Sequence, residues 1–169
     1  MNKELKIKVC GMRDAENIHQ LVTLPIDYIG FIFYAKSARF VSGKPEVSIP
    51  SSIKKVGVFV NSSKEEITAK IKEFDLQVVQ LHGDESTEFC QEIKDLDIET
   101  FKAFGIDDKF DWATIATYEG KVDYFLFDTK SKKYGGTGQT FNWDKLKNYP
   151  YKTPYWLSGG ISLENIEEA

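Results

Sequence analysis

Short apolar runs alternate with helix-length segments along the whole chain. The runs are expected to be strands, and they lie at residues 5–10, 27–33, 54–60, 78–82, 99–104, 123–128 and within 154–160. Strands separated by helix-length segments imply parallel pairing through crossover connections. The pattern therefore predicts an α/β fold, either an open doubly wound sheet or a closed (β/α)8 TIM barrel. The number of runs favours the barrel, although only seven strands are present.

Helical periodicity fills most of the intervals between these runs. Residues 14–24, 63–74 and 87–96 carry apolar side chains at helical spacing, and another helix is expected to begin at about Leu163. Asp14 and Ser63 are suitable N-caps. The interval at residues 42–52 contains Pro45 and Pro50, so a loop is expected there in place of a long helix.

Length and charge narrow the class of protein. A chain of 169 residues suits a single domain, predicted to span residues 1–169. The net charge of −4 and the scattered lysines give no basic stripe for nucleic acid. The N-terminus lacks the apolar core of a signal peptide, and no run approaches the ~20 apolar residues of a membrane span. Two cysteines make no disulfide framework, which indicates a reducing compartment, so the chain is predicted to be cytoplasmic. The charge and the lack of a membrane span predict no nucleic-acid or membrane partner.

Reactive residue types recur where the expected strands end, which is where α/β folds place their active sites. Cys10 ends the first run and could be a base or a nucleophile, or simply a small buried apolar residue. Asp128 follows four apolar or aromatic residues, where a carboxyl group can keep its proton and act as an acid. A turn or capping role for Asp128 is the alternative.

Three further polar residues could bind a substrate. Arg39 follows the second run, where its guanidinium could hold a carboxylate through two parallel hydrogen bonds, or be an ordinary loop charge. Gln80 and His82 share one strand face, and His82 could polarise a substrate or serve a structural role. The spacing of Cys10, His82 and Cys90 does not match a zinc site, so no metal is expected.

Two glycine-rich segments differ in what they predict. Residues 135–140, GGTGQT, lack the terminal lysine of a Walker loop and the third glycine of a dinucleotide fingerprint. A mobile cover over a ligand, spanning residues 130–138, fits this segment better. Gly159 and Gly160 precede a helix start near Ser162, a suitable place for a phosphate in a barrel.

The strand-end motifs together resemble one family, phosphoribosylanthranilate isomerase of tryptophan biosynthesis. The motifs are KVCGM, GFIFYAKSARF, VGVFVN, VVQLHGDE, FDTKSKKYGGTGQTFNWD and LSGGISLEN, in order from Lys8 to Asn165. The resemblance implies a (β/α)8 barrel that rearranges N-(5-phosphoribosyl)anthranilate to 1-(2-carboxyphenylamino)-1-deoxyribulose 5-phosphate without a cofactor.

The same resemblance implies roles for individual residues. Cys10 corresponds to the family's general base and Asp128 to its general acid. Arg39 corresponds to the arginine that holds the anthranilate carboxylate, and Gly159 and Gly160 hold part of the phosphate. The only partner expected is the small phosphorylated substrate, with the chain itself a monomer or a homodimer.

The sequence departs from the family after the seventh run. The family continues with an eighth strand, a second phosphate loop and a final helix, and the 169 residues contain none of them. A fragment is favoured over a natural seven-strand enzyme, and an inactive remnant is one alternative. Another is a sugar-phosphate isomerase of histidine biosynthesis, but such enzymes pair two aspartates, whereas Cys10 occupies the first strand end here.

Overall fold

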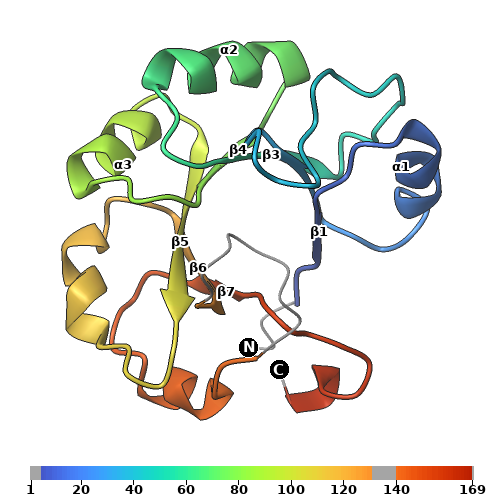
Figure 1. Cartoon of the computed structure of the whole chain (residues 1–169). Helices are drawn as coiled ribbons and strands as arrows, with labels where there is room; N and C mark the ends of the chain where they lie inside the picture. The colour runs from blue at the N-terminus through green and yellow to red at the C-terminus, as the bar shows by residue number, and fades with distance from the viewer. Residues whose placement is uncertain (1–4, 131–139, 169) are drawn as a thin grey trace. The chain divides into compact units, whose positions relative to one another are not determined.

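Strands and helical segments alternate along the chain in the computed structural model, which describes residues 5–130 and 140–168 (Figure 1). Within these residues the strands are β1 (Lys8–Cys10), β2 (Tyr28–Ile32), β3 (Lys54–Phe59), β4 (Val78–Leu81), β5 (Glu99–Ile106), β6 (Tyr124–Thr129) and β7 (Tyr155–Leu157). The α-helices are α1 (Ala15–Leu21), α2 (Lys64–Phe74) and α3 (Thr87–Lys94). The described residues also form three 3₁₀ segments: η1 (Trp112–Tyr118), η2 (Trp143–Asn148) and η3 (Ile166–Glu168). The chain divides between Gln80 and Leu81 into two compact units.

The first unit is built on parallel strands in chain order. β1 pairs with β2, with Cys10 opposite Gly30, and β2 pairs with β3, with Gly30 opposite Val56. Since the strands are parallel, their carboxyl ends meet at one edge of the sheet. The helices α1 and α2 lie on one flank of these strands (Figure 1).

Side-chain caps fix where the helices of the first unit begin. The Asp14 carboxylate accepts a hydrogen bond from the Asn17 N–H at 2.9 Å, so α1 starts at the cap predicted from the sequence. Ser63 and Glu66 form a complete capping box at the start of α2. These bonds satisfy N–H groups that the first turn of a helix leaves without an intrahelical acceptor.

The connection from β2 to β3 contains no helix in residues 33–53, all of which are described, as Pro45 and Pro50 predicted. Instead, the chain folds back immediately after β2. Phe40 bridges to Ile32, and the Val41 N–H donates to the Ile32 carbonyl at 3.0 Å. This return brings residues 38–40 back to the end of β2, which sets the position of Arg39.

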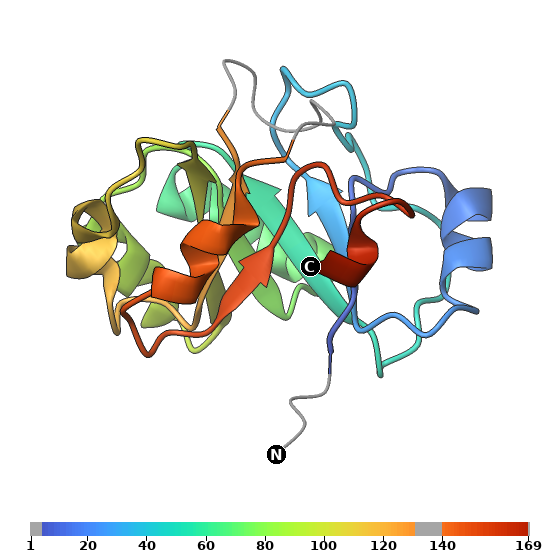
Figure 2. The ribbon, with the colours of Figure 1, turned by 90° about the horizontal axis from the view of Figure 1, so that it is seen from below.

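The second unit repeats the parallel arrangement with less regular connections. β5 pairs with β6, with Gly105 opposite Asp128, and β6 pairs with β7, with Phe127 opposite Leu157. The helix α3 packs on β5, whereas the two following connections, η1 and η2, are 3₁₀ rather than α. Figure 2 shows these helical segments on one flank of the strands of their unit.

The central residues of β3 and β6 are buried on both faces, as their continuous apolar runs predicted. In the first unit Val56, Val58 and Phe59 are all buried, although successive side chains of a strand point to opposite faces. In the second unit Phe125 and Phe127 are fully buried. This is the pattern of a parallel sheet covered on both sides.

The expected helix near Leu163 differs from the structure. Residues 163–165 form a turn, and only the short η3 follows. The Ser162 carbonyl accepts from both the Asn165 and the Ile166 N–H groups, at 3.3 and 3.0 Å. This shared acceptor marks a tight turn of mixed 3₁₀ and α character, rather than a regular α-helix.

Candidate active site

Cys10 lies at the carboxyl end of β1, partly exposed and packed over Gly30. A Cβ atom on Gly30 would lie 2.8 Å from the Cys10 sulfur, so the thiol occupies the space that the glycine leaves open. The Gly30 carbonyl accepts from the N–H groups of Gly11 and Met12, at 2.9 and 3.0 Å. The thiol is therefore held at a strand end whose backbone bonds lead into the following turn.

Arg39 comes from the loop after β2 and lies over the turn after Cys10. Its Nη1 donates to the Cys10 carbonyl at 3.1 Å. Gly11 has φ +87°, and a Cβ atom there would lie 2.7 Å from Arg39 Cδ. The structure thus brings two predicted site residues, Cys10 and Arg39, together within the first unit. The third, Gln80, lies in β4 and is only 2% exposed.

Asp128 is the penultimate residue of β6 and is the centre of the second unit's polar cluster. One carboxylate oxygen accepts from the Thr129 N–H at 2.8 Å. The other lies 3.7 Å from His82 Nε2, and the two side chains are only 14% and 19% exposed. Two residues predicted from separate strand ends are therefore neighbours, largely screened from solvent.

Gly159 lies directly against the Asp128 carboxylate. Its φ is +87°, and a Cβ atom there would lie 2.5 Å from Asp128 Oδ1 and 2.7 Å from the Thr129 nitrogen. Gly160 also has a positive φ, +71°, and its carbonyl accepts from the Asn165 side chain at 2.9 Å. Only glycine fits the close approach at position 159, because any side chain would overlap the carboxylate.

Two buried charged residues were missed by the sequence reasoning. Lys102, in the middle of β5, forms an ion pair with Glu85 at 3.1 Å, and both side chains are 3% exposed. The available signal was a lysine inside the otherwise apolar segment TFKAF. A charged residue in such a run is uncommon unless a partner is buried with it.

The second cysteine, Cys90, has a different environment from Cys10. It is fully buried in α3, and burial raises the pKa of its thiol to about 12, partly opposed by the positive charge of Lys102. Burial also raises the pKa of the nearby Tyr118 hydroxyl. Cys90 is therefore an un-ionised packing residue at neutral pH.

The predicted mobile cover spans residues 130–138, after the end of β6. Residues 131–139, which include most of that segment, lie outside the described residues. After them, Phe141 is buried and the Asn142 side chain caps η2. The chain after the undescribed segment therefore continues directly into η2, which begins at Trp143.

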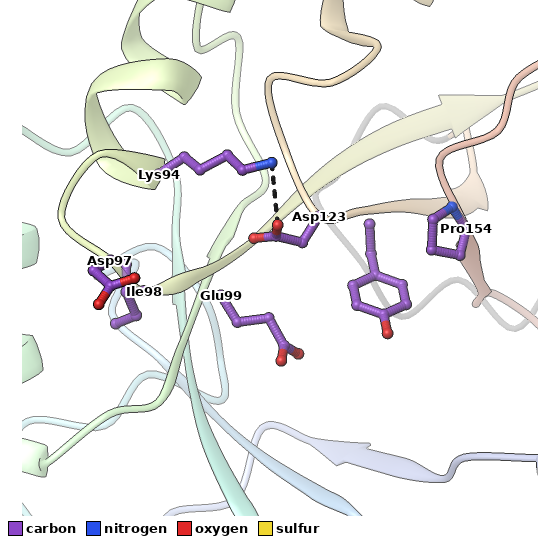
Figure 3. Close-up of a pocket in the computed structure, with 7 residues that line it drawn as sticks. Lys94, Asp97, Ile98, Glu99, Asp123 and Pro154 are labelled. Carbon is purple, nitrogen blue, oxygen red and sulfur yellow. Dashed lines mark ion pairs between the residues drawn. The ribbon is translucent and has the colours of Figure 1, made fainter.

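A pocket in the second unit lies at the other end of the strands (Figure 3). Its volume is about 480 Å³, and it is lined by Lys94, Asp97, Ile98, Glu99, Asp123, Tyr124 and Pro154. These residues surround the amino ends of β5, β6 and β7, whereas Asp128 lies at the carboxyl end of β6 and Gly159 follows that of β7. Figure 3 shows Lys94 directed at Asp123, and the ion pair measures 3.1 Å. The pocket therefore contains none of the predicted site residues.

The described residues contain neither a metal-binding cluster nor a membrane-spanning helix. Among residues 5–130 and 140–168, no group of three or more His, Cys, Asp or Glu side chains is placed to hold a metal ion. None of the helices formed by the same residues has the length and apolar character needed to cross a membrane.

Comparison with known proteins gives one family throughout. The family model described as N-(5'phosphoribosyl)anthranilate (PRA) isomerase matches residues 7–169. The N-(5'-phosphoribosyl)anthranilate isomerase of Phocaeicola vulgatus is 48% identical over 155 residues, which cover 92% of this chain and 75% of the relative.

Solved structures agree in fold. The phosphoribosyl anthranilate isomerase of Thermotoga maritima has a TM-score of 0.82 at 34% identity, covering 97% of this chain and 81% of its own. A phosphoribosyl anthranilate isomerase solved with reduced 1-(o-carboxyphenylamino)-1-deoxyribulose 5-phosphate has a TM-score of 0.62 at 27% identity, covering 94% and 89%. These enzymes are (β/α)8 barrels, so the predicted fold class is confirmed.

Proposed function

Because this chain belongs to the phosphoribosylanthranilate isomerase family, we propose that it catalyses the Amadori rearrangement of N-(5-phosphoribosyl)anthranilate. The product is 1-(2-carboxyphenylamino)-1-deoxyribulose 5-phosphate, and the reaction is a step of tryptophan biosynthesis. The observation that carries the proposal is the shielded carboxyl group of Asp128, which lies between His82 and Gly159 at a strand end.

Asp128 is the general acid in this mechanism. It gives a proton to the ring oxygen of the ribose, the ring opens, and the anthranilate nitrogen forms a Schiff base with C1. A carboxyl group that is 14% exposed and accepts a backbone hydrogen bond on one oxygen is suited to proton transfer in a site with little water. His82, 3.7 Å away, is close enough to influence the charge of Asp128.

Cys10 is the general base. Its thiolate removes the proton from C2 of the open sugar, and the electrons move to the Schiff base to give an enolamine. The enolamine then tautomerises to the ketone product. The substrate's own nitrogen accepts the electrons, so the proposed chemistry uses no cofactor. Gly30 supports this role because its missing side chain is the space the sulfur occupies.

Two further groups bind the ends of the substrate. Arg39 holds the anthranilate carboxylate, since its guanidinium lies beside Cys10 and can present a fork of N–H donors. The backbone at Gly159 and Gly160 receives part of the phosphate, because two successive positive-φ residues form a concave turn in which N–H groups can converge. Gln80 and His82 are each assigned to substrate binding, as the sequence predicted.

The small phosphorylated substrate is the only partner in this proposal. The state of the chain as monomer or homodimer, its cytoplasmic location and its lack of nucleic-acid binding stay predictions from the sequence. The organisation of residues 1–169 as a single barrel domain without an eighth strand also stays a prediction.

The proposal is tested by incubating the purified chain with N-(5-phosphoribosyl)anthranilate and following the loss of its anthranilate fluorescence. Turnover is expected on this substrate, with no turnover on the aminoimidazole ribonucleotide that the isomerase of histidine biosynthesis uses. Turnover only on the second compound would favour that alternative enzyme. A folded chain that turns over neither compound would support an inactive remnant.

A further inference from the structure

Lys102 is a charged residue buried in the middle of a strand, which requires an explanation. It lies in β5 and is 2% exposed. A buried ammonium group is costly unless hydrogen bonds and an opposite charge replace its water. Its partners therefore show what the buried charge does in this fold.

The ammonium group of Lys102 binds the backbone that follows β4. It donates to the Gly83 carbonyl at 2.7 Å and to the Ala103 carbonyl at 3.1 Å. The Leu81 carbonyl lies at 3.5 Å, and Glu85 Oε2 at 3.1 Å. Most of these partners belong to the short segment 81–85, so the lysine ties β5 to the turn between β4 and α3.

Glu85 completes the same arrangement from the other side. Its two carboxylate oxygens accept from the Gly83 N–H at 2.9 and 3.1 Å. Its own carbonyl accepts from the Tyr118 hydroxyl at 2.9 Å, which anchors the segment to η1. The N–H of Gly83 is therefore held by Glu85 and its carbonyl by Lys102, and the two holding groups are themselves ion-paired.

Gly83 directly follows His82, whose imidazole lies 3.7 Å from Asp128. We propose that the buried Glu85–Lys102 ion pair positions His82 beside Asp128 by fixing the backbone of Gly83. Lys102 and Glu85 are positioning residues that act through His82, since their contacts are with the Gly83 backbone rather than with the carboxylate of Asp128. The value of this arrangement for turnover rests on the proposed function, in which Asp128 is the acid.

The positioning itself is testable without any enzyme assay. The chain has only two histidines, His19 and His82, so the imidazole titrations can be assigned by NMR with a His19→Gln variant. In the chain with Lys102 intact, Asp128→Asn should change the titration midpoint of His82, because the carboxylate faces His82. In Lys102→Met, the same Asp128→Asn change should no longer alter the His82 titration.

A matched control is Lys94→Met. Lys94 also pairs with a carboxylate, Asp123 at 3.1 Å, and donates to a carbonyl, Gly120 at 3.3 Å, but at the other end of the same strands (Figure 3). The response of His82 to Asp128→Asn should persist in Lys94→Met. A persistent response in Lys102→Met as well would overturn the proposal.

A second variant covers the case in which Lys102→Met does not fold. It leaves the Glu85 charge buried without its partner, a change that commonly destabilises proteins. The double variant Lys102→Met with Glu85→Gln buries no unpaired charge, yet it still lacks the donor to Gly83. The response of His82 to Asp128→Asn should be lost there too, and its survival would equally overturn the proposal.

Measurements of turnover test whether the positioning of His82 matters for the reaction. In the double variant, kcat per folded molecule should fall roughly 10- to 100-fold with little change in KM, as expected for a displaced group near the reacting atoms. A parent-like kcat together with a lost His82 response would overturn the catalytic part. If the parent itself has no turnover on N-(5-phosphoribosyl)anthranilate, the proposed function fails, while the NMR result still decides the positioning.

Discussion

Gly159 is the single residue that most directly joins the proposed acid to the proposed phosphate loop. Its φ of +87° is a left-handed conformation, and the nearest atom to an added Cβ would be an oxygen of Asp128 at 2.5 Å. Two separate requirements therefore exclude other residues: backbone strain and overlap with the carboxylate. These two requirements can be separated experimentally, because Gly120 also has a positive φ but has open space where a Cβ would lie.

Gly159→Ala is expected to lose both stability and turnover. The left-handed conformation alone costs an alanine about 1 kcal/mol, and the Cβ must in addition displace the Asp128 carboxylate. Gly120→Ala is the matched control, since Gly120 has φ +77° and open space around its Cβ position. Unfolding by urea and kcat measurements should show a stability loss in both variants and a loss of turnover only at position 159. Equal turnover in the two variants would contradict the close approach to Asp128.

The polar residues at the strand ends could be predicted from the sequence, whereas the residues that contact them could not. Cys10 and Asp128 are visible in the sequence because polar types end apolar runs. The neighbourhood of His82 and Asp128 depends on pairing across distant strands, which a one-dimensional pattern does not specify. Lys102 was visible as an exception inside an apolar run, but its partner Glu85, 17 positions earlier, was not.

Among the elements, α2 has the clearest sequence signature and the clearest physical test. Ser63 and Glu66 exchange hydrogen bonds at its start. Glu66→Ala should lower the free energy of unfolding by about 1 kcal/mol, because it removes the acceptor for the Ser63 N–H. Glu65→Ala is the control, since Glu65 is also acidic and in the first turn but is not part of the box. Equal losses measured by urea unfolding would show that helix-dipole charge, not the capping box, is responsible.

The connections after β5 are the elements that the sequence did not specify. Asp111 and Asn142 cap η1 and η2 in the way that α-helices are capped. The ring of Trp112, the first residue of η1, packs against the rings of Phe127 and Tyr149, with centroids 5.2 and 5.3 Å away. Tertiary packing of large rings can override local helix preference, so the spacing of apolar residues in the sequence does not predict a 3₁₀ segment.

For the whole molecule, stability should fall in alkaline solution because of buried ionisable groups. The thiol of Cys90 has a pKa of about 12 in the folded chain against an ordinary value of 9.0. Between these values the unfolded chain has lost a proton that the folded chain keeps, so unfolding becomes more favourable as pH rises. This contribution is fully present below pH 9 and falls by up to about 1.4 kcal/mol per pH unit above it.

The contribution of Cys90 is isolated by comparing how steeply the free energy of unfolding falls with pH in the parent and in a Cys90 variant, rather than by comparing absolute stabilities. Burial also raises the pKa of Tyr149, and that effect is common to parent and variant. Cys90→Ala should therefore lose stability less steeply than the parent between pH 9 and 11, whatever its stability at pH 7. Parallel curves from denaturant unfolding at each pH would rule out an un-ionised buried thiol.

Most of the architecture, namely the parallel strands and the location of their carboxyl ends, could be predicted from the sequence. Alternating runs predicted parallel strands, and the register of β1 with β2 and of β5 with β6 places Cys10 and Asp128 at carboxyl ends. The choice between an open sheet and a barrel was not fixed by the alternation itself, because both use the same crossover units. Six motifs in order, rather than any one of them, indicated the family to which the chain belongs.

The central claim is that Asp128 and Cys10 are the acid and the base of one isomerisation. Its most direct test is kcat for N-(5-phosphoribosyl)anthranilate in Asp128→Asn and in Cys10→Ala, measured beside the parent chain. Each variant should lose roughly 10²- to 10⁴-fold in kcat with little change in substrate binding, since each group acts in the transition state. A kcat close to that of the parent in either variant would contradict the account.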